Sequence, residues 1–270
     1  MAAVKALVLT GYGLNCDYET AHALDLAGAS TERVHINTLI EGGKRLSDYR
    51  ILAFGGGFSW ADDHGAGVIQ AVRLKTNIGD QLLNFIEGGN LVIGICNGFQ
   101  ALVNLGLLPG FDGDYRSRSV AMTYNDCGNF RDDWVSLTVD PASPCVFTRD
   151  IRQIELPVRH GEGKFYADPA VIAKLRAGKQ VVMRYADADG TAAEGRFPQN
   201  PNGSVFDIAG ICDPTGRVFG LMPHPEAYHH FTNHPLWTRR KALQNRGKYL
   251  DAASEATGVE VFRNAVDYLQ

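Results

Sequence analysis

The segment GICNG, residues 94–98, places Cys96 between two glycines and directly after an apolar run. A strand that turns sharply into a helix forces its corner residue into an unfavourable backbone conformation. The flanking chain then passes so close that only small residues fit two positions before and after the corner. The helix N-terminus lowers the pKa of a corner thiol and so favours the thiolate, and the N–H of Asn97 can donate to an oxyanion. The pattern predicts that Cys96 is a nucleophile; the alternative is a buried structural cysteine.

A thiolate nucleophile needs a base and a group that orients the base, and the segment MPHPE, residues 222–226, offers both. His224 lies between two prolines at the end of a predicted strand, which limits its backbone freedom. The carboxylate of Glu226 can orient the imidazole and stabilise the imidazolium. By itself this segment could be a surface turn rich in proline and acid. Together with the cysteine corner, it predicts a triad of Cys96, His224 and Glu226.

A glycine-rich segment, FGGGFSWADD at residues 54–63, follows another predicted strand. Glycines allow backbone N–H groups to point into a site, so Gly57 and Phe58 are candidates for the second oxyanion donor. The alternatives are a phosphate-binding loop and a simple structural turn. No Gly-Lys-Ser/Thr follows the glycines, and Asp62 and Asp63 would repel phosphate, which disfavours a nucleotide site.

Strands and helices alternate in the first half of the chain, and these elements must position the chemical groups. Apolar runs predict buried strands, and residues with helical spacing lie between them. The expected strands are 4–10, 33–36, 50–54 and 90–95, and the expected helices are 18–29, 67–86 and 98–108. We therefore expect an open, mostly parallel α/β sheet with helices on both faces, with chemistry at the carboxyl ends of its strands.

The second half of the chain predicts a small antiparallel addition to this sheet. Strands are expected at 133–139 and 180–186, a helix at 169–178, and a hairpin that turns at 213–216 and ends at Met222. The segment after residue 230 is polar, basic at first and mostly helical in pattern. We expect the chemistry in a domain of residues 1–230, with a helical C-terminal extension, 231–270, packed on or near it.

Composition excludes several classes of protein. Hydrophobic residues make up 45% of the 270, enough for a full core, and the net charge of −4 gives no general basis for binding nucleic acid or an anionic membrane. No segment approaches the roughly 18 apolar residues of a membrane span, and we expect no secretory signal. The chain has five cysteines and no Cys-x-x-Cys pair, which favours a reducing cytoplasm over a disulfide framework or a zinc site.

Taken together, these motifs resemble the class I, or triad, glutamine amidotransferases. The finer similarity is to the glutaminase subunits of phosphoribosylformylglycinamidine synthase, and it covers roughly residues 4 to 230. It rests on the segments GLNCD, GGFSWADD, GICNGFQALVNLGLLPG, VRHGEGKFY and AGICDPTGRVFGLMPHPE. One departure is Phe-Ser-Trp-Ala-Asp, where relatives usually have Phe-Ser-Tyr-Gly-Asp, so we expect loop contacts to differ there.

The resemblance implies a flavodoxin-like core and a role for each motif. It implies Cys96 as the nucleophile, His224 as the base and Glu226 as the partner of the base. It also implies that Gln100 lies near the glutamine pocket, and that Gly57 and Asn97 form the oxyanion hole. It further places residues 160–163 near the active-site face, where His160 and Glu162 would offer polar contacts to a partner.

The resemblance also implies the reaction and its partners. Glutamine would be hydrolysed to glutamate and ammonia. A separate ATP-dependent synthetase subunit would use the ammonia to convert formylglycinamide ribonucleotide to formylglycinamidine ribonucleotide in purine biosynthesis. A small third subunit is also expected. The chain has no Walker-type loop, so we expect no cofactor in this chain, with ATP and Mg²⁺ only in the partner.

Two other interpretations remain open from the sequence. The chain could be the glutaminase component of another synthase or a γ-glutamyl hydrolase, although HGEGKFY and the Cys-Asn-Gly segment argue against both. It could also be a scaffold of the same fold that has lost turnover. The presence of all three triad residues argues against a scaffold.

Overall fold

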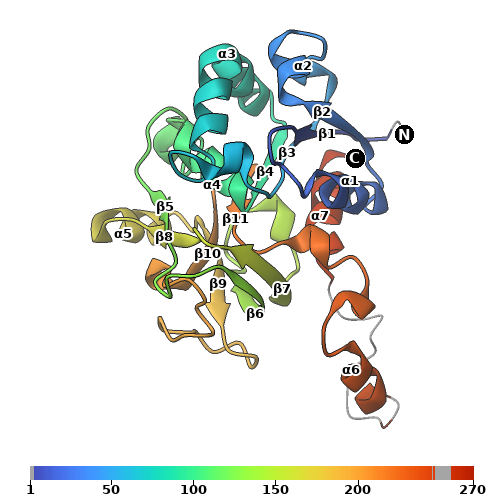
Figure 1. Ribbon diagram of the computed structural model, residues 1–270, viewed down its shortest axis with the longest axis vertical. Coiled ribbons are helices and arrows are strands. Elements are labelled where there is room, and N and C mark those ends of the chain that lie inside the picture. Colours follow the sequence, from blue (N-terminus) through green and yellow to red (C-terminus); the bar gives the residue numbers. More distant parts are fainter. Residues whose placement is uncertain (1–2, 245, 247–256) are drawn as a thin grey trace.

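The computed structural model describes residues 3–244, 246 and 257–270, and a large sheet with helices on both faces runs through it (Figure 1). One half of the sheet is parallel, in the strand order β2-β1-β3-β4-β11. These strands are β1 (Lys5–Thr10), β2 (Ser30–His35), β3 (Ile51–Phe54), β4 (Leu91–Ile95) and β11 (Val218–Leu221). Residues of β3, β4 and β11 are all buried, as expected for strands covered on both sides.

The antiparallel addition continues the same sheet beyond β11, in the order β10-β9-β6-β7. A separate two-stranded sheet pairs β5 with β8. The bounds are β5 (Ala121–Thr123), β6 (Arg131–Val139), β7 (Gln153–His160), β8 (Lys164–Tyr166), β9 (Val181–Ala186) and β10 (Ile208–Cys212). The expected fold class and the hairpin at 213–216 are confirmed.

The helices form two layers because the chain reverses direction in the sheet. The connection from β1 to β2 runs toward one edge and the later crossovers run toward the other, so right-handed crossovers place their helices on opposite faces. Helix α1 contacts α7 on one side, and α3 contacts both α2 and α4 on the other (Figure 1). The helices are α1 (Asp17–Leu26), α2 (Ile36–Ile40), α3 (Val68–Glu87), α4 (Asn97–Leu105), α5 (Pro169–Ala177), α6 (Trp237–Gln244) and α7 (Val259–Leu269). Among the described residues, no helix is long and apolar enough to cross a membrane.

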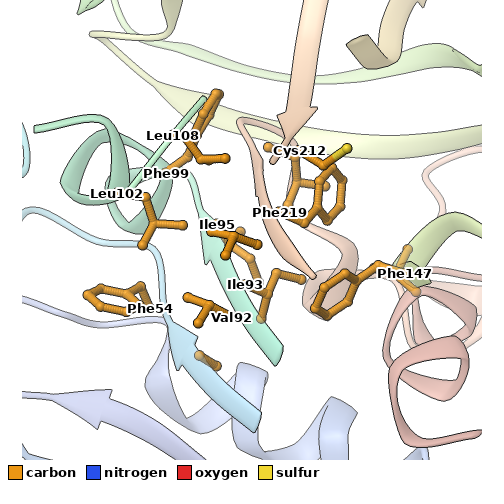
Figure 2. Close-up of a cluster of buried hydrophobic side chains, with 14 of the residues drawn as sticks. Phe54, Val92, Ile93, Ile95, Phe99, Leu102, Leu108, Phe147, Cys212 and Phe219 are labelled. Atoms are coloured by element: carbon orange, nitrogen blue, oxygen red, sulfur yellow. The ribbon is translucent and has the colours of Figure 1, made fainter. Parts of the chain in front are cut away.

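The core around the central strands is filled from both faces (Figure 2). Phe99 of α4 packs over β11 at Gly220, where an added Cβ would lie 2.1 Å from the Phe99 ring. Phe147 and Phe219 pack with ring centroids 5.6 Å apart. The glycine in β11 thus makes room for a large side chain from the helix that follows Cys96.

Helix α7 belongs to this core. Its apolar face, formed by Val261, Phe262, Ala265 and Val266, is fully buried. Just before the helix, the N–H of Gly258 donates to the carbonyl of Tyr228 at 2.8 Å, so the end of the chain is fastened to the segment that follows the His-Pro-Glu motif. The extension expected after residue 230 therefore contributes to the core, although its residues 245 and 247–256 lie outside the described part.

One strand of the sheet lacked a clear signal in the sequence. β7 carries Pro157 in its interior, and proline argues against a central strand because it cannot donate to the ladder. The structure resolves the conflict by placing β7 at the edge of the sheet.

The contact between Gly258 and Pro225 predicts a large effect of one methyl group. A Cβ on Gly258 would lie 1.9 Å from the Pro225 carbonyl oxygen, so α7 must shift. We expect Gly258→Ala to lower the free energy of unfolding by about 2–4 kcal/mol, measured by denaturant titration. Gly79→Ala is the control, because no atom lies within 4 Å of the added Cβ in α3, and it should be neutral or stabilising. Equal stability of the two variants would contradict the packing described here.

Candidate active site

Cys96 occupies the corner between β4 and α4 in a strained conformation, with φ 51° and ψ −107°. A Cβ at position 98 would lie 2.0 Å from the carbonyl oxygen of Phe54, and one at position 94 would lie 2.7 Å from the carbonyl oxygen of Gly98. Both glycines of the Gly-x-Cys-x-Gly pattern are thus required by backbone-to-backbone contact.

The neighbouring strand brings the histidine segment to this corner. β4 and β11 pair in parallel with Ile95 opposite Leu221, and the N–H of Cys96 donates to the carbonyl of Leu221 at 2.8 Å. His224 follows three residues later, and its N–H donates to the carbonyl of Pro157 at 2.8 Å. Two strand ends and one edge strand therefore place the thiol and the imidazole together.

His224 and Glu226 form a buried pair. Nδ1 of His224 lies 2.6 Å from Oε1 of Glu226, and the two residues are 1% and 0% exposed. Burial lowers the pKa of His224, but the charges of Glu226 and Cys96 outweigh burial and hold this pKa well above its usual value. These charges therefore favour the protonated imidazolium form of His224 in the resting site. Its Nε2 has no partner among the described residues, so this nitrogen is available to a substrate.

A second thiol, Cys16, lies beside the same imidazole. Its sulfur, a ring nitrogen of His224 and a carboxylate oxygen of Glu226 lie within 4.8 Å of one another. Burial raises the pKa of Cys16, so its thiol stays protonated at neutral pH and is a poor nucleophile. These three atoms could also coordinate a thiophilic cation, but only by engaging the two groups that a triad needs. No role was predicted for Cys16, because its proximity to His224 arises only in the folded chain.

The glycine-rich loop supplies one free backbone donor. The N–H of Phe58 donates to the carbonyl of Gly13 at 2.9 Å, whereas the N–H of Gly57 makes no hydrogen bond within the described chain. Gly57 has φ +140°, and a Cβ there would lie 2.5 Å from the Gly13 carbonyl oxygen. Asn97 begins α4, and first-turn N–H groups have no acceptor within the helix. Of the expected oxyanion donors, Gly57 and Asn97 thus have N–H groups available to a ligand, whereas the N–H of Phe58 is already engaged.

Gln100 belongs to a polar group beside the first turn of α4. Its Nε2 donates to the carbonyl of Glu162, and its Oε1 lies 3.4 Å from Nδ2 of Asn97. The same Nδ2 donates to Oδ1 of Asp62 at 2.8 Å. Asp62 follows two residues with positive φ, the Trp-Ala pair in which this loop departs from the usual family pattern. The resemblance pointed to Gln100 and Asn97 and placed Glu162 near the active-site face as a contact for a partner, but it assigned no role in this group to Asp62.

His160 does not offer a contact to a partner, which corrects the expectation for residues 160–163. It is 2% exposed, with Nδ1 at 3.1 Å from Oδ1 of Asn125 and Nε2 at 3.5 Å from Nδ2 of Asn202. Burial lowers its pKa to about 3, so the ring stays neutral. Gly163 is required beside it, because a Cβ there would lie 2.3 Å from the ring. His160 therefore supports the turn, and Glu162 is the side chain of the turn that reaches the site.

Comparisons with known proteins identify the relatives of this chain. Residues 3–269 match the family model of the CobB/CobQ-like glutamine amidotransferase domain. The chain is 45% identical to phosphoribosylformylglycinamidine synthase subunit PurQ of Methanococcus maripaludis, over 98% of this chain and 97% of that protein. It is 44% identical to PurQ of Dehalococcoides mccartyi, over 99% and 98%. The structure of PurLQS from Thermotoga maritima superposes with a TM-score of 0.70, at 28% identity and full coverage of both chains.

The two thiols of the site should differ sharply in reactivity. Because burial keeps Cys16 protonated and Cys96 lies beside an imidazolium, we expect iodoacetamide at neutral pH to alkylate Cys96 first. Peptide mass spectrometry over a time course would locate the label. Cys96→Ala should remove the fast phase and Cys16→Ala should keep it. Fast labelling of Cys16 in the unsubstituted chain would show that the nucleophile is misassigned.

Proposed function

The chain belongs to the CobB/CobQ-like glutamine amidotransferase family, and we propose that Cys96, His224 and Glu226 carry out its chemistry. It acts as the glutaminase subunit of phosphoribosylformylglycinamidine synthase, supplying ammonia for formylglycinamidine ribonucleotide in purine biosynthesis. The identity of 44–45% over nearly the whole chain carries the functional assignment. The proposed roles of the residues are supported by the strained corner at Cys96 and the buried pair of His224 and Glu226.

The first half of the reaction forms a thioester. The sulfur of Cys96 attacks the side-chain amide carbon of glutamine, and the electrons of the C=O bond move to oxygen. The N–H groups of Gly57 and Asn97 hold this oxyanion. When the oxyanion collapses, the C–N bond breaks, and the imidazolium of His224 gives its proton to the departing nitrogen. Ammonia leaves, and the γ-glutamyl group remains on sulfur.

The second half of the reaction restores the enzyme. Neutral His224 now takes a proton from water, whose oxygen attacks the thioester carbon. The C–S bond breaks, glutamate departs and the sulfur of Cys96 is regenerated as a thiolate beside the imidazolium. Glu226 keeps Nδ1 of His224 protonated throughout, so Nε2 is the nitrogen that exchanges protons.

Partners are needed for the complete synthesis. The similarity to PurQ, and to a chain of the PurLQS structure, implies a synthetase subunit that receives the ammonia. We further propose that a small third subunit completes the complex and that ATP and Mg²⁺ are used only by the synthetase. The reaction would take place in the cytoplasm, where a reducing environment protects the free thiols of Cys16 and Cys96.

Replacing the nucleophile should separate the two half-reactions. In the complex assembled with the synthetase, Cys96→Ser should abolish glutamine-dependent synthesis and leave ammonia-dependent synthesis within about twofold of the unsubstituted complex. The serine hydroxyl is far less acidic than the thiol, so it cannot form the acyl-enzyme at a useful rate. Product formation with each nitrogen source is the measurement. If both activities are lost, Cys96 has a structural role.

The charge of Glu226 should affect how kcat/KM depends on pH. His224→Ala removes the proton carrier and should abolish turnover. Glu226→Gln should remain partly active, with kcat lower by tenfold or more. The charge of Glu226 raises the pKa of His224, so Glu226→Gln lowers that pKa. The imidazolium is then lost at lower pH, and the alkaline limb of kcat/KM should move to lower pH. An unshifted limb would show that Glu226 does not act on His224.

A further inference from the structure

One wall of the active site presents oxygen atoms that have no cationic side chain beside them among the described residues. Asp62 comes from the loop after β3, and Glu162 comes from the turn between β7 and β8. Asn97 and Gln100 lie between them on the first turn of α4 and are hydrogen-bonded to both: Asn97 to the carboxylate of Asp62 and Gln100 to the backbone carbonyl of Glu162. Three segments distant in the chain thus converge beside the residue that follows Cys96.

The electrostatics of this wall call for a positive charge. Burial, together with the nearby negative charge of Glu162, raises the pKa of Asp62 to about 6. Within the described residues, neither carboxylate forms an ion pair with a lysine, arginine or histidine. Oε2 of Glu162 accepts only a backbone hydrogen bond, from the N–H of Ala66 at 3.2 Å. Two like charges held near one another without a cation are destabilising unless a ligand supplies the cation.

A buried oxygen with no partner points to the same kind of ligand. Asn97 is fully buried, and its Oδ1 has no hydrogen-bond partner in the described structure, whereas its Nδ2 is committed to Asp62. Reversing the amide would not help, because Oδ1 would then face the carboxylate oxygen of Asp62. An unpaired buried acceptor is costly, so its natural complement is a donor from a bound molecule. Within the described structure, the donors of this wall are thus already engaged, and the wall has no positive charge.

We propose that Asp62, Glu162 and Oδ1 of Asn97 form the subsite for the α-ammonium group of glutamine. An ammonium group carries three N–H donors and one positive charge, which matches a set of acceptors with two carboxylates. This inference rests on the proposed function, because it takes glutamine as the substrate at Cys96.

The position of the wall fits the length of the substrate. The amide carbon attacked by Cys96 is separated from the α-carbon of glutamine by two methylene groups, so the α-ammonium lies a few ångströms from the sulfur. Asn97 follows Cys96 directly, and Gln100 lies one helical turn along the same face. A substrate anchored through its ammonium therefore presents its amide to the thiol, and related amides without this group are rejected because the wall is then left unpaired.

A metal ion is the other ligand that oxygen atoms of this kind could hold. The ammonium is favoured because the substrate carries one: the α-ammonium of glutamine is part of the same molecule as the amide that Cys96 attacks. Two amide side chains also take part, and each has an N–H group that already donates to a neighbouring oxygen.

The test compares glutamine with 4-carbamoylbutanoate, which is glutamine without its α-amino group, in the assembled complex. Hydrolysis of glutamine by the unsubstituted complex is measured first, because its absence would refute the proposed function and not this subsite. Asp62→Asn and Glu162→Gln then remove one charge each and keep an oxygen acceptor for the Asn97 and Ala66 donors. We expect each to lower kcat/KM for glutamine by tenfold or more, mainly through KM, and to leave the analogue within about twofold.

Asp63→Asn is the matched control, because this neighbouring carboxylate is exposed and outside the group. It should leave the ratio of the two kcat/KM values unchanged. Equal losses for glutamine and the analogue in Asp62→Asn and Glu162→Gln would overturn the proposal, since they would show a structural role. An unchanged preference for glutamine over the analogue in Asp62→Asn and Glu162→Gln would also overturn it. So would a divalent-cation requirement for hydrolysis that disappears in Asp62→Asn.

Discussion

The active site depends on the close approach of α4 to β3, at the point where Gly98 meets the carbonyl oxygen of Phe54. A single methyl group there would lie 2.0 Å from that oxygen. Because no side chain intervenes, the helix starts directly after β4, and Cys96 at the corner adopts a strained conformation with positive φ. The same compression brings the first turn of α4 against the glycine-rich loop, so the oxyanion donors and the acceptors around Asn97 occupy one small volume. Strain of this kind persists only where the surrounding sheet holds it on all sides.

The charged pair at the base of the site is held at some cost. Removing His224 and Glu226 from water carries a desolvation penalty that their mutual attraction offsets only with short, well-directed hydrogen bonds. The 2.6 Å contact meets this condition for one nitrogen and one oxygen, while Nε2 and the second carboxylate oxygen have no partner in the described part of the chain. Such unpaired atoms are common at functional sites, where the missing partner belongs to the substrate or to a reaction intermediate. The protein core thus sustains an arrangement that stability alone would not favour.

Local patterns in the sequence predicted those features that are themselves local. The glycines around Cys96, the prolines around His224 and the apolar runs of the central strands each express a constraint between residues close in the chain. The remaining features depend on contacts between distant segments. Asp62 meets Asn97 across 35 residues, and Gln100 meets Glu162 across 62, so neither pairing leaves a periodic signal. His160 was misread for the same reason: its neighbours Asn125 and Asn202, which bury it, lie in separate loops. β7 was obscured by Pro157, whose place at a sheet edge is a property of the whole fold.

The anchoring of Gly258 also bears on the order in which a newly made chain becomes active. Translation delivers Cys96 to the ribosomal exit first, then His224 and Glu226, and only afterwards residues 258–269. Until that last segment emerges, the carbonyl of Tyr228 lacks its donor and the apolar faces that receive α7 stay open to water. The loop carrying Glu226 is therefore secured late, after the nucleophile and the base are already outside the ribosome.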